Sequence, residues 1–136
     1  MANTDAYTYK AADNYRMEAS KLMLAPDDGT YNIIKIPMYA LITDAWIQIV
    51  TAFTVNATVE VGWLGNGETA VTNGLITNDI ANPTVAGLKR AFNTALTTFP
   101  GKYFSDAAGA VTVTVADVDG AVGDFRVFIQ FTVIHA

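Results

Sequence analysis

Apolar and polar side chains alternate in several separate segments of this chain, and this alternation constrains the fold more strongly than any other feature. The segments 44–53 and 58–64 show it most clearly. A strand turns successive side chains to opposite faces, so a period of two residues indicates strands with one buried face. The residues expected on the buried faces are Ala45, Ile47, Ile49 and Phe53 in the first segment and Val59, Val61 and Trp63 in the second.

The C-terminal segment 111–136 shows the same alternation twice, around a turn that contains Asp and Gly. We expect the segments 111–115 and 125–133 to pair as a hairpin. Phe128 and Ile134 fall on the polar face of this hairpin, where apolar side chains are not expected. The face predicted to be buried carries Val111, Val113, Val115, Phe125, Val127, Ile129, Phe131 and Val133.

Turn signals divide the rest of the chain into short segments. The segment 30–36 ends before Pro37, which cannot donate a hydrogen bond inside a sheet, and the Pro-Asp-Asp-Gly sequence at 26–29 predicts a turn. Gly and Asn indicate a loop at 65–74. Short strands separated by such turns, in a chain of 136 residues rich in Thr, Val and Ile, are typical of a single-domain β-sandwich or barrel.

Two segments are open to more than one interpretation. Residues 13–24 form either a short helix or part of an extended arm, and residues 75–98 form either a short helix or an irregular strand and loop. We therefore expect an N-terminal arm or short helix over 1–25 and a β-sandwich domain over 26–136. The residues with helical spacing in the second open segment are Leu88, Phe92 and Leu96.

Charge and composition exclude several classes of protein. The net charge is −5 and the 8 basic residues are scattered, so the chain lacks the basic patch of a nucleic-acid binder. Without Cys it forms neither a disulfide nor a thiolate metal site. No apolar run approaches the roughly 18 residues of a membrane span, and the N-terminus does not resemble a signal peptide. We expect synthesis in the cytoplasm and no membrane partner.

No set of side chains predicts catalysis, so we expect no enzyme activity and no cofactor. Ser20, Ser105 and His135 lack the pattern of a nucleophilic triad, and a residue next to the chain end makes a poor base. One His cannot form a zinc site within a single chain, although three copies of His135 could meet on a trimer axis. Acidic pairs at 27–28 and 117–119 lie in predicted turns and lack the other ligands of a calcium loop. We therefore expect no metal site.

Apolar side chains on faces predicted to be polar are the best candidates for a functional surface. Phe128 and Ile134 lie among polar residues in one strand, and Trp46 and Val50 flank Gln48 in another. Either another part of the chain covers these side chains, or they form a subunit interface. The charged fraction of only 15% agrees with a well-filled core or with a surface covered by partners. Anchors of the same kind in an N-terminal arm would be Tyr7, Tyr9 and Tyr15.

Three segments resemble small virion proteins of tailed bacteriophages, in particular capsid decoration (cement) proteins and related head-surface proteins. They are NIIKIPMYALITDAWIQIVTAF, ATVEVGWLGN and GKYFSDAAGAVTVTVADVDGAVGDFRVFIQFTV, which cover roughly residues 30–64 and 101–134. The resemblance implies a jelly-roll β-sandwich, a homotrimer, and binding to the major capsid protein on the surface of the virion. It also implies an N-terminal arm that reaches over the capsid or a neighbouring subunit. It provides no catalytic residues.

We therefore expect a structural virion protein that binds the phage head as a homo-oligomer and stabilises the shell. The alternative is a phage tail or fibre protein, or a β-sandwich module that binds carbohydrate or a host receptor. In that alternative Trp46, Trp63 and Tyr103 would stack on sugar rings, although Trp63 falls on a face predicted to be buried.

Overall fold

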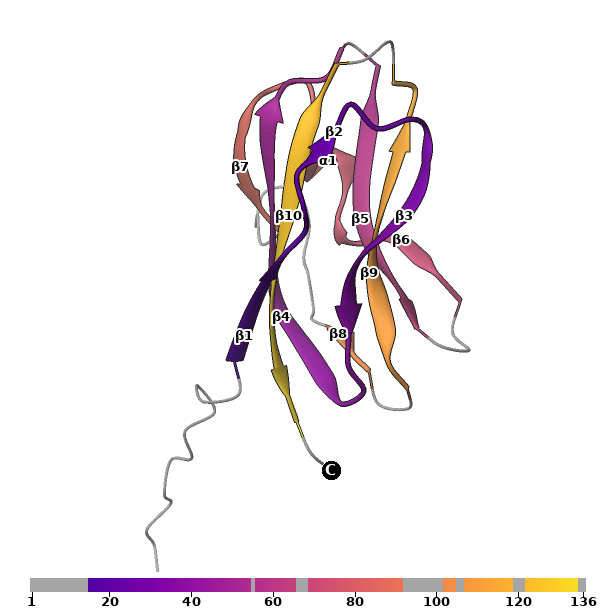
Figure 1. Ribbon diagram of the computed structural model, residues 1–136, viewed down its shortest axis with the longest axis vertical. Helices are drawn as coiled ribbons and strands as arrows, with labels where there is room; N and C mark the ends of the chain where they lie inside the picture. Colours follow the sequence, from indigo (N-terminus) through magenta and orange to yellow (C-terminus); the bar gives the residue numbers. More distant parts are fainter. Residues whose placement is uncertain are drawn as a thin grey trace, which may run out of the picture.

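Antiparallel strands form most of the computed structural model, which describes residues 15–54, 56–65, 69–91, 102–104, 107–118 and 122–134. They make two sheets, here named sheet A and sheet B, that pack face to face (Figure 1). Sheet A contains, in spatial order, β1 (Tyr15–Ala19), β10 (Asp124–Val133), β4 (Ala40–Thr51) and β7 (Gly87–Arg90), while β2 (Met23–Leu24) pairs with β10 and β8 (Lys102–Tyr103) with β4. Sheet B contains, in spatial order, β3 (Gly29–Ile36), β9 (Gly109–Ala116), β5 (Thr58–Gly65) and β6 (Val71–Ile76). A short helix, α1 (Asn78–Ala81), follows β6.

The antiparallel pairs are nested along the chain. The first described strand pairs with the last, β1 with β10; then β3 pairs with β9, β4 with β7, and β5 with β6. A chain paired in this way folds over into two sheets that share one core, which is the jelly-roll arrangement. The fold is therefore the all-β, antiparallel, jelly-roll-like sandwich that the sequence predicts.

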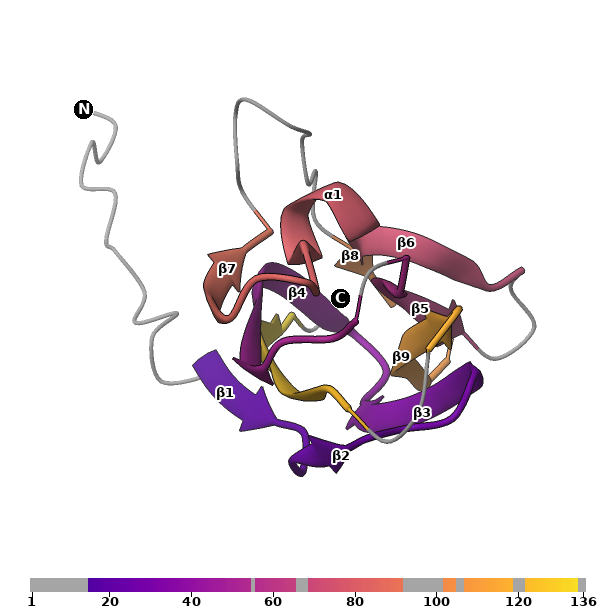
Figure 2. The same cartoon turned by 90° about the horizontal axis from the view of Figure 1, so that it is seen from above.

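The core lies between the two sheets, where their inner faces meet (Figure 2). Ile47 of β4 and Val127 of β10 are completely buried, while their neighbours along each strand point away from the core. The alternation in the sequence has thus become the two faces of a sheet. The predicted buried side chains that are confirmed are Ala45, Ile47, Ile49, Phe53, Val59, Val61, Val111, Val113, Val115, Phe125, Val127, Ile129 and Phe131, and Trp63 and Val133 are partly buried against the same core.

The C-terminal segments do not form the predicted hairpin. β9 lies in sheet B between β3 and β5, and β10 lies in sheet A between β1 and β4, so the chain crosses from one sheet to the other between them. This arrangement gives each strand a hydrogen-bonded neighbour on both sides, and the apolar faces of the two strands meet across the core. Gly123, just before β10, has a φ of +115°, and a Cβ there would lie 2.4 Å from the ring of Phe53. The entry into β10 therefore requires glycine.

Residues 15–24 form strands rather than a helix, because β1 and β2 pair with β10. Ser20 holds this segment in place. Its backbone N–H donates to the Val127 carbonyl over 2.8 Å, and its Oγ accepts the Val127 N–H over 2.9 Å. Residues 1–14 lie outside the described residues, so the division into an arm over 1–25 and a domain over 26–136 stays a prediction.

The segment between β5 and β8 also differs from the expectation. Part of the predicted loop at 65–74 is strand β6, which pairs with β5. The helical spacing that begins at Leu88 is not realised there, because Leu88 lies in β7 opposite Gln48 of β4. A short helix occurs earlier, where Thr77 Oγ1 caps α1 by accepting the Ile80 N–H. Phe92 and Leu96 lie outside the described residues.

Replacing Phe125 with Ala should lower the free energy of unfolding by about 3–5 kcal/mol, because it leaves a cavity in the core. Phe125 is completely buried, and its ring centroid lies 6.0 Å from that of Phe53. Val50→Ala is the control, since Val50 is 46% exposed. It should change the free energy of unfolding by less than about 0.5 kcal/mol. Denaturation in urea, followed by circular dichroism, measures both values, and equal losses would contradict this assignment of faces.

Candidate interaction surface

The outer face of sheet A carries an aromatic pair at its centre. Trp46 of β4 lies directly opposite Phe128 of β10. The next residues along these strands, Ile47 and Val127, form a buried pair, so Trp46 and Phe128 point to the outer face. Directly opposed residues of antiparallel strands have Cβ atoms about 4.5–5.5 Å apart, within contact distance for two aromatic side chains. The structure therefore brings together two of the interface residues predicted from the sequence.

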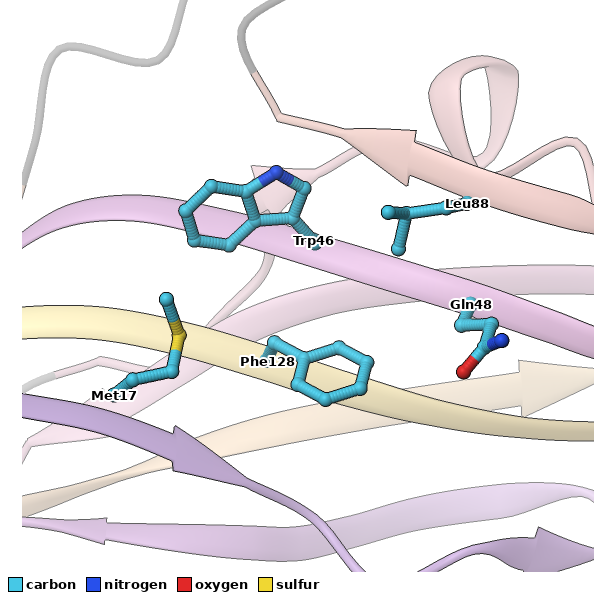
Figure 3. Close-up of a pocket in the computed structure, with 5 residues that line it drawn as sticks. All are labelled: Met17, Trp46, Gln48, Leu88 and Phe128. Carbon is cyan, nitrogen blue, oxygen red and sulfur yellow. The ribbon is translucent and has the colours of Figure 1, made fainter.

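Met17 of β1 and Leu88 of β7 extend this pair across the sheet in both directions. Together with Trp46, Gln48 and Phe128 they line a hollow of about 260 Å³. Figure 3 shows these five side chains. Met17 is 55% exposed and Leu88 is 64% exposed. We name Met17, Trp46, Leu88 and Phe128 the outer apolar cluster. It takes one side chain from each of β1, β10, β4 and β7, so it exists only in the assembled sheet.

An ion pair holds one end of the cluster in place. Arg90 lies opposite Trp46, and its guanidinium carbon is 5.7 Å from the centre of the Trp46 ring. Arg90 Nε donates to Asp44 Oδ2 over 2.8 Å, and Arg90 Nη2 donates to the same oxygen. Asp44 is buried, and its Oδ1 accepts the Ala45 N–H over 2.9 Å. Hydrogen bonding to Asp44 and the charge of Asp44 raise the pKa of Arg90. An arginine is always a cation in proteins, so its guanidinium can make a cation–π contact with the Trp46 ring.

Polar side chains border the cluster on the same face. Arg126 lies opposite Gln48, two residues from Phe128 along β10. On the other side of Phe128, Gln130 Oε1 accepts a hydrogen bond from Thr43 Oγ1 over 3.3 Å. An apolar centre with a polar border is the usual arrangement of a protein–protein interface.

The other predicted interface residues do not join the cluster. Val50 is exposed, but it is the extra residue where the register of β4 on β10 shifts. Ile134 is 42% exposed and follows the end of β10. Tyr15 begins β1, at the opposite end of the strand from Ala19, which pairs with Phe128. The two predicted residues outside the described part of the chain are Tyr7 and Tyr9.

Sequence reasoning did not find Met17 and Leu88. Each is a single apolar residue in a segment whose secondary structure remained open, so its face could not be assigned. Met17 stands between Arg16 and Glu18, and Leu88 stands before Lys89. An isolated apolar residue in a charged strand was the available signal, but it becomes informative only when the neighbouring strand is known.

The outer face of sheet B is polar by comparison. Thr30 Oγ1 and Thr114 Oγ1 form a hydrogen bond of 3.0 Å, and Thr72 Oγ1 donates to Glu60 Oε2 over 3.2 Å. Leu64, near the end of β5, is 38% exposed. These hydroxyl and carboxylate groups bind one another across neighbouring strands. Among the described residues, the outer apolar cluster distinguishes the outer face of sheet A from that of sheet B.

Two of the residues considered for catalysis or metal binding, Asp28 and Ser20, bind backbone groups. No group of three or more His, Cys, Asp or Glu side chains among the described residues could hold a metal ion. Asp28 Oδ1 accepts the Val118 N–H over 3.0 Å, which ties the segment before β3 to the end of β9. Ser20 Oγ binds backbone groups. Ser105 and His135 lie outside the described residues. None of the described helices is long and apolar enough to span a membrane.

The aromatic residues of the carbohydrate-binding alternative do not form one platform. Trp46 lies on the outer face of sheet A, whereas Trp63 belongs to sheet B and packs against the core. Lys102 Nζ lies 5.3 Å from the centre of the Trp63 ring. Tyr103 is 37% exposed in β8. A sugar ring stacked on Trp46 would therefore not contact Trp63.

Replacing Asp44 with Ala should lower the free energy of unfolding by about 1–3 kcal/mol, because the buried Ala45 N–H loses its acceptor. Asp27→Ala removes the same charge from an exposed position and should change the free energy of unfolding by less than about 0.5 kcal/mol. Thermal and urea denaturation measure both values. Equal stability of the two variants would show that the Asp44 contacts do not support the sheet.

No protein-family model and no curated protein matches this sequence. Solved structures match in fold. A chain in the acid-stable capsid of Helicobacter pylori bacteriophage KHP30 has a TM-score of 0.61 and 12% identity, over 87% of this chain and 86% of that chain. A chain in the cyanophage Pam1 capsid has a TM-score of 0.58 and 12% identity, over 98% of this chain and 94% of that chain. A chain in the capsid of Ralstonia phage GP4 has a TM-score of 0.58 and 12% identity, over 90% of this chain and 84% of that chain. This chain therefore shares its fold with chains found in three phage capsids.

Proposed function

We propose that this chain is a structural virion protein that decorates the capsid of a tailed bacteriophage and stabilises its shell. The observation that carries the proposal is the outer apolar cluster, in which Met17 and Leu88 are exposed, Trp46 and Phe128 are partly buried, and polar side chains form the border. Contiguous apolar surface of this kind marks an interaction site. The fold shared with phage capsid chains supports a capsid as the partner.

The match to one capsid chain covers nearly all of both chains. The match to the Pam1 chain covers 98% of this chain and 94% of that chain, so the two are similar in length. We propose the major capsid protein as the surface on which the outer apolar cluster docks. Burying one aromatic or large aliphatic side chain contributes about 1.5–3 kcal/mol. Trp46 and Phe128 would therefore anchor each copy, while Arg126 and Gln130 form hydrogen bonds at the border.

Stabilisation of the shell follows from the number of copies bound. A filled capsid pushes outward, and a decoration protein that bridges neighbouring capsid subunits adds contact area where the shell is weakest. Modest binding at each of many linked contacts gives a large collective effect. No chemical step is required, which agrees with the absence of a predicted catalytic group in the sequence.

The finer parts of this proposal come from the sequence resemblance. They are a homotrimer, a position on the outer surface of the virion and an N-terminal arm, while synthesis in the host cytoplasm is expected from the N-terminal sequence. The low charged fraction of 15% supports extensive contact with partners. The arm would add contacts through Tyr7, Tyr9 and Tyr15.

Leu88→Asp should abolish binding to capsids assembled in the absence of this chain, because it places a charge within the apolar contact. Leu88 is exposed in the free chain, so the fold should be retained. Leu64→Asp is the matched control on the outer face of sheet B and should bind like the wild type. Co-sedimentation with capsids measures binding, and circular dichroism checks the fold. Equal binding by both variants would exclude the outer apolar cluster as the contact.

Binding of the wild-type chain should persist in about 0.5 M NaCl, where interactions between exposed charges are largely screened. The reason is that the proposed contact is mainly apolar, and apolar burial does not weaken with salt. The fraction of chain bound should change by less than about twofold, within the effect expected for the few border charges. A steep loss of co-sedimentation with salt would indicate a charge-driven contact instead.

A further inference from the structure

β1 forms an open edge of sheet A. The order of the sheet is β1-β10-β4-β7, and in the described part of the chain no strand lies on the other side of β1 (Figures 1 and 2). Its exposed residues include Arg16, Met17 and Glu18. Neither Arg16 nor Glu18 has an ion-pair partner among the described residues. The edge is therefore available to another strand.

The backbone of β1 can pair on this edge without rearrangement. The N–H of Ser20 points toward β10, since it donates to the Val127 carbonyl. Backbone groups of a strand alternate between its two neighbours, so Tyr15, Met17 and Ala19 turn their N–H and C=O groups toward the open edge. These three positions are symmetric about Met17.

The other edges of the two sheets are less suited to pairing. β3 contains a register irregularity between Asn32 and Ile34 and ends before Pro37. β6 pairs with β5 through an irregular register, and β7 begins at Gly87 with a φ of +142°. Bulges, proline and irregular backbone protect edges from strand addition. The register of β1 on β10 is continuous, and β1 contains neither Gly nor Pro.

The side chains of β1 are complementary to those of a second copy of β1 at this open edge. If a second copy of β1 pairs antiparallel about Met17, Arg16 of each copy lies opposite Glu18 of the other. Opposite charges on directly facing positions stabilise antiparallel strands. Met17 then faces Met17 of the second copy in a hydrogen-bonded pair, with Cα atoms about 5.5 Å apart. The sequence Arg-Met-Glu is thus complementary to itself.

We propose that two copies of this chain associate through their β1 edges, antiparallel about Met17, so that sheet A continues from one copy into the other. The axis of this two-fold pair is perpendicular to the sheet, so both outer apolar clusters lie on the same face, with the two Met17 side chains between them. This pairing goes beyond the proposed function and does not rest on it. In a decorated shell it would connect two neighbouring copies.

Met17→Cys tests the register directly, because the chain has no other Cys and a Cα separation of about 5.5 Å permits a disulfide. Under mild oxidation, this variant should form a covalent dimer at least about tenfold faster than Val85→Cys, which reports random collision. Val85 is a suitable control because it is 52% exposed, like Met17 at 55%. Equal rates of dimer formation in the two variants would overturn the proposal.

Charge exchange then tests the complementarity. In the Met17→Cys background, Arg16→Glu or Glu18→Arg alone should slow dimer formation roughly tenfold, because like charges face each other at both ends of the pair. The double variant Arg16→Glu/Glu18→Arg should restore the original rate. A double variant as slow as the single ones would overturn the proposed register. The assay uses the free chain, so its outcome does not depend on whether the chain binds capsids.

Discussion

The pairing of β10 with β4 is the constraint on which the rest of the structure depends. Its register runs from Asp124 opposite Thr51 to Val133 opposite Ala40. The same register places Val127 beside Ile47 in the core and Phe128 beside Trp46 on the outer face. A slip of one residue would exchange these faces, so core burial sets the position of the outer aromatic pair. The strong preference for burying the inner side chains therefore also determines the surface.

The two sheets share one core, but their outer faces differ in polarity. Sheet B covers its half of the core and presents hydroxyl groups that bind one another, such as those of Thr30 and Thr114. Sheet A presents an apolar cluster to which all four of its main strands contribute, and the Asp44–Arg90 ion pair fixes one side of it. The outer face of sheet B is therefore suited to solvent, and we propose that the outer face of sheet A contacts a partner. This asymmetry, rather than any reactive group, supports a structural role.

Prediction from the sequence succeeded where a pattern is local and failed where pairing is long-range. The alternation from Phe125 to Phe131 identified both a strand and its buried face, because period-two burial is a property of each strand alone. The same local reading suggested that 111–115 and 125–133 pair as a hairpin, whereas they belong to different sheets. Pairing with distant strands is favoured over a local hairpin, because β9 and β10 then each have a hydrogen-bonded neighbour on both sides. Leu88 shows the same effect, since pairing with Gln48 of β4 overrides its helical spacing.

By itself, the sequence determined that segments such as 44–53, 58–64 and 125–133 form strands with one apolar face each. It also determined that Trp46 and Phe128 lie on the other, outer faces of their strands. Side-chain alternation along a strand is sufficient for both conclusions. Only the tertiary structure decided which strands are neighbours, and hence that Trp46 and Phe128 meet each other and are joined by Met17 and Leu88. The physical reason is that a surface cluster depends on the order of strands in a sheet. That order is set by the simultaneous closure of one core, to which strands of both sheets contribute, and not by any segment alone.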